Sequence, residues 1–199
     1  MIGIKASNAF LVIVIFISHF FAPTGYVFYE HTMSEMAAQF APNAWILTTG
    51  FVGAGIGYIV FAYHAWVKKS IPTWLYGLVI ANGVTLILLA FFPTSFDGYT
   101  MPANETVVII HRYIAYASNF ITILSLGLHA YFSKGKVRYI HSIFIALAII
   151  FSAFFIGYNQ DVRGVFQRLI LITTSSWTWF YFGTMNRSSE TQAQSLVRS

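Results

Sequence analysis

The sequence predicts an all-α integral membrane protein, a polytopic bundle of six transmembrane helices with both termini on the cytoplasmic side. Hydrophobic residues make up 57% of the 199 residues and charged residues only 9%, whereas soluble domains contain about 25% charged residues. The hydrophobic residues fall into long runs, and a spanning helix needs about 20 apolar residues in succession. A soluble protein needs more charge to cover its surface, so the bilayer is the expected environment.

Six segments have the length and composition of spanning helices. They cover residues 6–22, 43–67, 72–92, 105–132, 138–158 and 164–183. Pro23 and Gly25 close the first span and Pro93 stops the third, because proline lacks the backbone N–H that a helix needs. The very short turns around Lys68-Lys69 and at 133–137 predict two antiparallel hairpins, of spans two and three and of spans four and five.

The length is that of a single domain. Residues 1–185 are expected to form the membrane domain, and residues 186–199 a polar cytoplasmic tail that its composition predicts to be disordered. Lys5 before the first apolar run is typical of the charged lead of a signal peptide. No small-residue cleavage site follows, so we expect the first helix to be retained.

The basic residues predict the orientation. Eight of the eleven fall on one side of the predicted bundle: Lys5, Lys68, Lys69, Lys134, Lys136, Arg138, Arg187 and Arg198. Five of the six acidic residues fall on the other side: Glu30, Glu35, Asp97, Glu105 and Asp161. Cytoplasmic loops carry the excess of lysine and arginine, so the termini are predicted inside and the acidic loops outside.

Composition also excludes several classes of function. The net charge of +5 lies at the ends of apolar runs rather than in a basic patch, so no nucleic acid partner is expected. The chain has no cysteine, which excludes disulfides, thiolate metal sites, cysteine catalysis and covalently attached haem. Six histidines leave a haem or metal site as a less favoured alternative, but their spacing matches no zinc motif. We therefore predict no metal and no cofactor.

Ionisable side chains inside the predicted spans indicate a site near the outer face, because such groups are costly at membrane depth. Arg168 lies more than one turn into the sixth span beside Gln167, His111 lies in the outer part of the fourth, and Ser34-Glu35 precedes the second. We expect an outward pocket in which Glu35 pairs with Arg168. His111 and Glu35 would be the catalytic candidates if chemistry occurs. A structural Glu35–Arg168 clasp and snorkelling of Arg168 to lipid headgroups stay open as alternatives.

A polar stripe follows the fourth span along one face. It consists of His111, Ser118 and Ser125, with Ala115, Thr122 and His129 in the adjacent row, and the sixth span has a comparable patch at 173–176 and Thr178. Hydrogen bonding between helices is the favoured interpretation, and a proton or solute path is the alternative. Gly50, Gly53 and Gly57 indicate a close-packing helix face.

Five short motifs in order resemble a family of bacterial and archaeal membrane proteins known only as a domain of unknown function. The motifs are Thr32-Met-Ser-Glu35, Pro42-Asn-Ala-Trp45 with Gly50-Phe51, Phe92-Pro-Thr94, His111 and Gly164-Val-Phe-Gln-Arg168. The resemblance implies six helices in a prokaryotic inner membrane and a shared cluster of Ser34, Glu35, His111, Gln167 and Arg168. It implies no activity. In the family an acidic residue often follows the Phe-Pro-Thr motif directly. Here Ser95 and Phe96 lie between this motif and Asp97, so the resemblance assigns no role to Asp97. A fainter likeness links the chain to eukaryotic autophagy modulators and GPI-anchor remodelling factors.

Three functions stay open from the sequence. The first is handling of a membrane lipid or small amphiphile at a substrate-binding site formed by Ser34, Glu35, His111, Gln167 and Arg168, in which the guanidinium holds an anionic group. The second is a non-catalytic structural or regulatory subunit, in which Glu35 and Arg168 form a clasp. The third is a proton-coupled transporter that uses the stripe of the fourth span. The sequence selects neither a substrate nor a protein partner.

Overall fold

The structure, a computed structural model, describes residues 2–69, 71–99, 101–157 and 160–197, with the backbone alone at 2, 160 and 183–197. Regular structure in these ranges is entirely helical, which confirms the predicted all-α class. Two short 3-10 helices, η1 (Met33–Ala37) and η2 (Gln160–Val162), lie in loops. The α-helices are α1 (Ile2–Phe20), α2 (Ala44–Val67), α3 (Thr73–Phe91), α4 (Glu105–Phe132), α5 (Gly135–Gly157) and α6 (Arg163–Val197).

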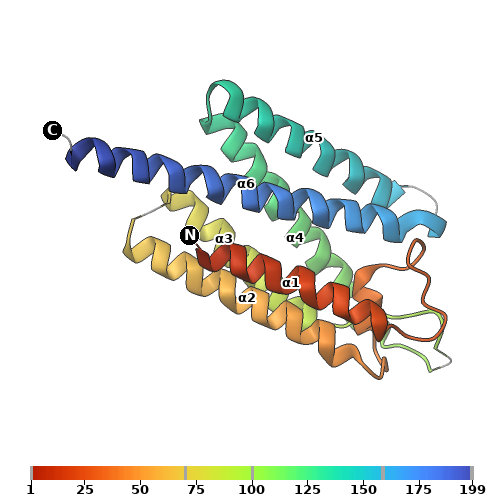
Figure 1. Ribbon diagram of the computed structural model, residues 1–199. Helices are drawn as coiled ribbons and strands as arrows, with labels where there is room; N and C mark the ends of the chain where they lie inside the picture. The colour runs from red at the N-terminus through yellow and green to blue at the C-terminus, as the bar shows by residue number, and fades with distance from the viewer. Residues whose placement is uncertain (1, 70, 100, 158–159, 198–199) are drawn as a thin grey trace.

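The six helices form a ring, because each packs on the next along the chain and α6 returns to contact α1 (Figure 1). Both termini lie at one end of the bundle with the α2–α3 and α4–α5 turns, and we call this the turn end. The longer α1–α2 and α3–α4 connections gather at the opposite end, which we call the loop end. The ring therefore encloses a space that every helix can line.

Five helices, α1 to α5, are long and apolar enough to cross a membrane. The sixth is not among them, since its first two turns carry Arg163 and Arg168 and a run of hydroxyl side chains follows. It nevertheless lies alongside α1 and α5 in the bundle (Figure 1). A sixth crossing is therefore a prediction that this packing supports, and the cytoplasmic placement of the termini stays a prediction.

Helix boundaries follow the local residue types. Helix α1 ends at Phe20, shortly before Pro23. Gly25 then adopts a φ of +85°, a conformation that suits glycine. The side chain of Asn104 caps α4 by accepting a hydrogen bond from the Val107 N–H at 3.3 Å. Helix α5 begins at Gly135, three residues before the predicted start at Arg138. Gly135 has a φ of +55°, which glycine adopts readily, so the turn after α4 ends at this residue.

The polar stretch after Asn186 differs from the expectation of disorder. The backbone of α6 continues through it as a helix to Val197. Glutamate, glutamine, alanine and leucine in this stretch are good helix formers, which an argument from polarity alone does not take into account. The boundary between a membrane domain ending at 185 and a separate tail stays a prediction.

Glycines bring α1 and α2 close together, as the sequence predicted. A Cβ atom at Gly50 would lie 2.6 Å from a methyl group of Val14, and one at Gly53 would lie 2.5 Å from the ring of Phe10. Real Cβ contacts are essentially never this short, so larger residues would push the helices apart. The structural interpretation of Gly50, Gly53 and Gly57 is confirmed.

The predicted orientation can be tested with single cysteines, because the chain has none of its own. Lys134 at the turn end and Asp97 at the loop end are both exposed. In intact cells, an impermeant thiol reagent is expected to label Asp97→Cys and to leave Lys134→Cys unlabelled until the membrane is permeabilised. Labelling of Lys134→Cys in intact cells would show that the orientation is wrong.

Candidate functional site

Arg168 organises the loop between α1 and α2. Its Nη1 donates to the carbonyls of Gly164 at 2.8 Å and His31 at 3.1 Å. Its Nη2 lies 2.9 Å from His19 Nε2 and donates to the Tyr26 hydroxyl. The ring of Phe28 covers the guanidinium with its centroid 4.0 Å away, a cation–π contact. Four of the five N–H donors of Arg168 thus bind the protein itself, and the fifth, on Nε, has no partner among the described residues.

Burial is the main cause that raises the pKa of Tyr26 above its ordinary value, and the neighbouring Arg168 only partly opposes it. The phenol therefore stays protonated at neutral pH. It donates to the carbonyls of Thr32 or His31 at 3.1 and 3.4 Å while accepting from Arg168. Tyr26 thus connects helix α6 to the segment that leads into η1.

Glu35 pairs with Arg163, so the predicted Glu35–Arg168 pair is wrong. Glu35 Oε1 accepts from Arg163 Nη2 at 2.9 Å and from the hydroxyl and backbone N–H of Thr32 at 2.8 and 3.1 Å. Arg163 and Arg168 are five residues apart, which places them about 140° apart around a helix. The two arginines therefore point in different directions, and the loop path, which the sequence does not show, selects Arg163.

The first turn of α6 is built against the same loop. The N–H groups of Gly164 and Val165 donate to the carbonyls of Glu30 and Tyr29 at 3.2 and 3.3 Å, which satisfies donors that a helix start leaves free. A Cβ atom at Gly164 would meet the carbonyls of His31 and Phe28. Glycine is needed at this position because the loop backbone lies directly against the helix.

Three of the five predicted site residues meet at the loop end of a cavity, namely Ser34, His111 and Gln167. Gln167 Oε1 accepts from the Met33 N–H, and Ser34 Oγ lies 3.2 Å from the Thr32 hydroxyl. His111 Nδ1 lies 2.6 Å from the carbonyl of Phe92. A carbonyl only accepts, so Nδ1 carries the proton and Nε2 keeps the lone pair. Glu35 and Arg168 do not line the cavity.

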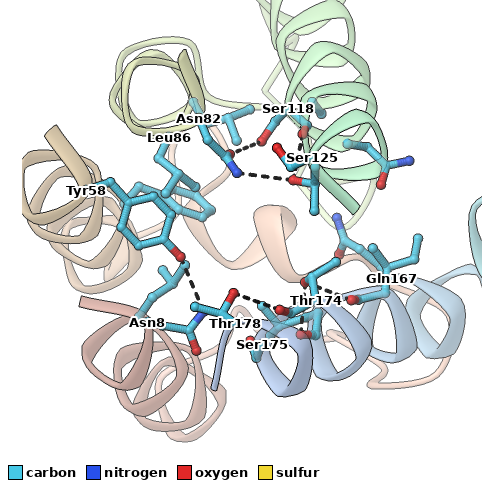
Figure 2. Close-up of a pocket in the computed structure, with 18 of the residues that line it drawn as sticks. Asn8, Tyr58, Asn82, Leu86, Ser118, Ser125, Gln167, Thr174, Ser175 and Thr178 are labelled. Atoms are coloured by element: carbon cyan, nitrogen blue, oxygen red, sulfur yellow. Dashed lines mark hydrogen bonds between the residues drawn. The ribbon is translucent and has the colours of Figure 1, made fainter. Parts of the chain in front are cut away.

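The cavity occupies the centre of the helix ring and has a volume of about 240 Å³. Residues from all six α-helices and from η1 line it. Apolar side chains such as Leu11, Phe51 and Leu86 alternate with uncharged polar ones, and Figure 2 shows these polar groups around the opening between the helices. Among the described residues that line the cavity there is no aspartate, glutamate, lysine or arginine.

One wall of the cavity is a closed network of hydrogen bonds between α3 and α4. Asn82 Nδ2 donates to the Thr122 hydroxyl and Asn82 Oδ1 accepts from the Ser118 hydroxyl, both at 3.1 Å. The Thr122 hydroxyl donates in turn to the Ser118 carbonyl at 2.9 Å. The polar stripe of the fourth span therefore serves in part for hydrogen bonding between helices, as the favoured interpretation held, and its side chains also face the cavity.

Three buried polar atoms in the cavity lining lack a hydrogen-bond partner in the described part of the chain: Asn8 Oδ1, Asn119 Oδ1 and Ser175 Oγ. They come from α1, α4 and α6 respectively. A buried polar group without a partner costs about 1–3 kcal/mol in proteins. Because these atoms are almost fully buried, they lie between the helices rather than on the surface of the cavity.

The chain matches the family described as "Protein of unknown function (DUF998)" over residues 6–182. The chain belongs to this family. The matched region includes all five predicted site residues, the three unpaired polar atoms and every lining residue except Ile4. No curated protein and no solved structure matches the chain. The membership agrees with the resemblance to an uncharacterised family, whereas the eukaryotic likeness stays an expectation.

The cavity lining also contains Asn8, Asn82 and Asn119, which were not among the residues predicted from the sequence. Each is an asparagine within an otherwise apolar stretch of α1, α3 or α4. The signal was present, because polar side chains at membrane depth normally face a partner or a cavity. These three amides carry no charge, so their cost at membrane depth is lower than that of the ionisable groups from which the site was predicted.

Two buried histidines lie behind the turn-end wall of the cavity. His129 Nδ1 lies 2.6 Å from the carbonyl of Ser125, and the Trp177 Nε1–H donates to His141 Nδ1 at 3.0 Å. Because an indole N–H only donates, the proton of neutral His141 lies on Nε2, which is then unable to bind a metal. Within the described residues, no three potential metal-binding side chains are grouped. The absence of a metal or cofactor stays a prediction.

Proposed function

We propose that the protein handles a small amphiphile, a membrane lipid or lipid-like molecule, within the central cavity. The observation that carries this proposal is the central cavity of about 240 Å³, which all six α-helices line with apolar and uncharged polar side chains. Inside a membrane, no bulk water hydrates such groups. The mixture of polar and apolar lining suits a molecule with a polar head and an apolar body.

The residues at the loop end divide into two roles. Ser34, His111 and Gln167 line the cavity and would contact the ligand, with the His111 Nε2 lone pair as the candidate general base if a reaction occurs. Glu35 and Arg168 hold the α1–α2 loop in place through Arg163, Tyr26 and backbone carbonyls. They would position the ligand-contacting residues without touching the ligand.

Each of the other two functions has one observation in its favour. The Glu35–Arg163 pair closes the loop onto the bundle, as a structural subunit would require, although with a different arginine from the expected one. The cavity lining extends from His111 towards the loop end to Trp177 and Phe182 towards the turn end, as a solute path would require. The volume and the mixed lining of the cavity favour ligand handling over a dry structural clasp. Unbroken helices α1 to α5 favour it over transport, since many transporters bind solutes at discontinuous helices.

Native mass spectrometry of gently purified protein tests the proposal. We expect a one-to-one complex with a molecule whose mass does not follow the detergent when the detergent is exchanged. Bare protein in every detergent would contradict the proposal and would leave water as the occupant of the cavity.

A further inference from the structure

We infer that His19 is an acid-sensitive switch, whose protonation weakens the hold of Arg168 on the α1–α2 loop and opens the loop end of the central cavity. The inference rests on the proposed function, because it assigns a regulation to the proposed ligand cavity. It concerns a histidine for which none of the functions above has a use.

The proton of neutral His19 lies on Nδ1. This nitrogen is 2.7 Å from the carbonyl of Ile15, and a carbonyl only accepts. Nε2 therefore keeps the lone pair and accepts from Arg168 Nη2 at 2.9 Å. Protonation of Nε2 would make it a donor that faces another donor. The hydrogen bond would be lost, and an imidazolium would lie against the guanidinium.

The surroundings of His19 offer no free negative charge to a protonated ring. The charged and titratable side chains around it are Arg168 on α6, Tyr26 and His31 in the loop, and Glu35 in η1. Glu35 is already held in an ion pair with α6, and the described residues show no ion pair between His19 and a carboxylate. Helix α2, which also packs on α1, has no charged side chain in its loop-end half. Two cations in contact repel more strongly at a half-buried site than in water, so protonation favours their separation.

His31, the other histidine of the loop, tolerates protonation better. Its Nδ1 accepts from the Val27 N–H at 2.8 Å, and the Val27 carbonyl lies 3.2 Å from the same atom. A protonated His31 can therefore donate to this carbonyl instead. Arg168 contacts His31 through the backbone carbonyl rather than through the ring. His19 is thus the histidine whose protonation acts directly on the guanidinium.

Arg168 connects His19 to the wall of the cavity. Its Nη2 contacts His19, and its Nη1 donates to the carbonyl of His31 at 3.1 Å, two residues before Met33. Met33 and Ser34 line the cavity, and the connection that carries them lies at the loop end of the bundle (Figure 1). A guanidinium that moves away from His19 therefore loosens the segment that forms this end of the cavity.

Hydrogen exchange of the full-length protein in nanodiscs tests the inference without any ligand. The readout is the protection of the backbone amides in residues 33–39, corrected for the intrinsic exchange rate at each pH. The N–H groups of Met33, Glu35 and Ala38 are hydrogen-bonded in this segment, so their exchange reports local opening. In the open loop His19 would titrate like an ordinary histidine, at about pH 6.5. Each pH unit below this value then favours opening by up to about tenfold, and we expect protection to fall roughly tenfold between about pH 7.5 and about pH 5.

Variants connect the response to His19. His19→Gln keeps an acceptor for Arg168 but has no titrating ring, so protection is expected to stay nearly constant over the same pH range. His19→Lys places a permanent positive charge there and is expected to lower protection already at neutral pH. His64→Gln is the matched control, because His64 lies exposed on α2. It is expected to respond like the wild-type protein.

Two results would overturn the inference. One is equal protection of residues 33–39 at both pH values in the wild-type protein, and the other is a fall in His19→Gln as large as in the wild-type protein. A ligand retained in native mass spectrometry would still uphold the proposed function in both cases. Bare protein in native mass spectrometry, by contrast, would contradict the proposed function whatever the exchange shows, so the two failures are distinguishable.

Discussion

Arg168→Met is expected to lower the free energy of unfolding by at least about 3 kcal/mol, because hydrogen bonds to a charged group contribute about 1.5–3 kcal/mol each and the substitution removes all those that Arg168 donates. The substitution leaves the carbonyls of His31 and Gly164, the Tyr26 hydroxyl and His19 Nε2 without their shared donor. These groups hold the α1–α2 loop on α6. The melting temperature and chemical unfolding of the detergent-solubilised protein provide the measurement.

Arg168→Lys is expected to be almost as destabilising. A planar guanidinium donates in several directions at once, whereas a lysine ammonium is a compact charge at the end of a flexible chain. Arg112→Met is the matched control, because Arg112 lies exposed on α4, and such surface changes usually stay within about 0.5 kcal/mol. Full stability of Arg168→Lys would show that charge alone, rather than the hydrogen-bond geometry, stabilises the loop.

Glu35 and Arg163 are expected to show a coupling of about 0.5–3 kcal/mol in a double-mutant cycle. The Glu35 side chain is 7% exposed and that of Arg163 is 39% exposed. Arg163→Met therefore leaves a buried carboxylate with the Thr32 donors alone, whereas Glu35→Gln leaves an arginine that water can reach. We expect Arg163→Met to be the more destabilising of the two. Unfolding in detergent of both single variants and the double variant measures the coupling.

The same cycle with Arg168→Met in place of Arg163→Met serves as the comparison. Glu35 accepts directly from Arg163 and shares with Arg168 only the loop that both hold. The coupling of Glu35 with Arg163 should therefore be the larger. A larger coupling with Arg168 would contradict the contacts described above.

The cost of placing polar side chains in hydrocarbon predicted a cluster of five residues near the outer face, but the pairing expected within it is wrong, because Glu35 pairs with Arg163. Ser34, Glu35, His111, Gln167 and Arg168 do gather near the loop end, because each is costly in hydrocarbon and needs a partner. Which arginine meets Glu35 depends on the path of the α1–α2 loop, and no periodicity encodes that path. Residue spacing predicts the face of a helix, but it does not predict which loop covers that face.

The cavity itself was less accessible to sequence reasoning. The polar stripe of α4 could be predicted from its helical spacing. In the structure, its hydroxyl groups form hydrogen bonds to Asn82, and its residues also line the cavity. That Asn119 Oδ1 stays unpaired depends on a hydroxyl of α5 and on the carbonyl that receives its proton. A single sequence does not show such a chain of donors.

A pair of matched substitutions on α4 tests most directly whether the cavity holds a ligand. Ala115 lines the cavity, whereas Ala117, two residues further along, is exposed on the outside of the bundle. Ala115→Phe places a ring in the cavity, and Ala117→Phe places the same ring against lipid. In native mass spectrometry, we predict that the wild-type protein and Ala117→Phe retain the same one-to-one ligand and that Ala115→Phe loses it. Retention of that ligand by folded Ala115→Phe at the wild-type level would contradict the account.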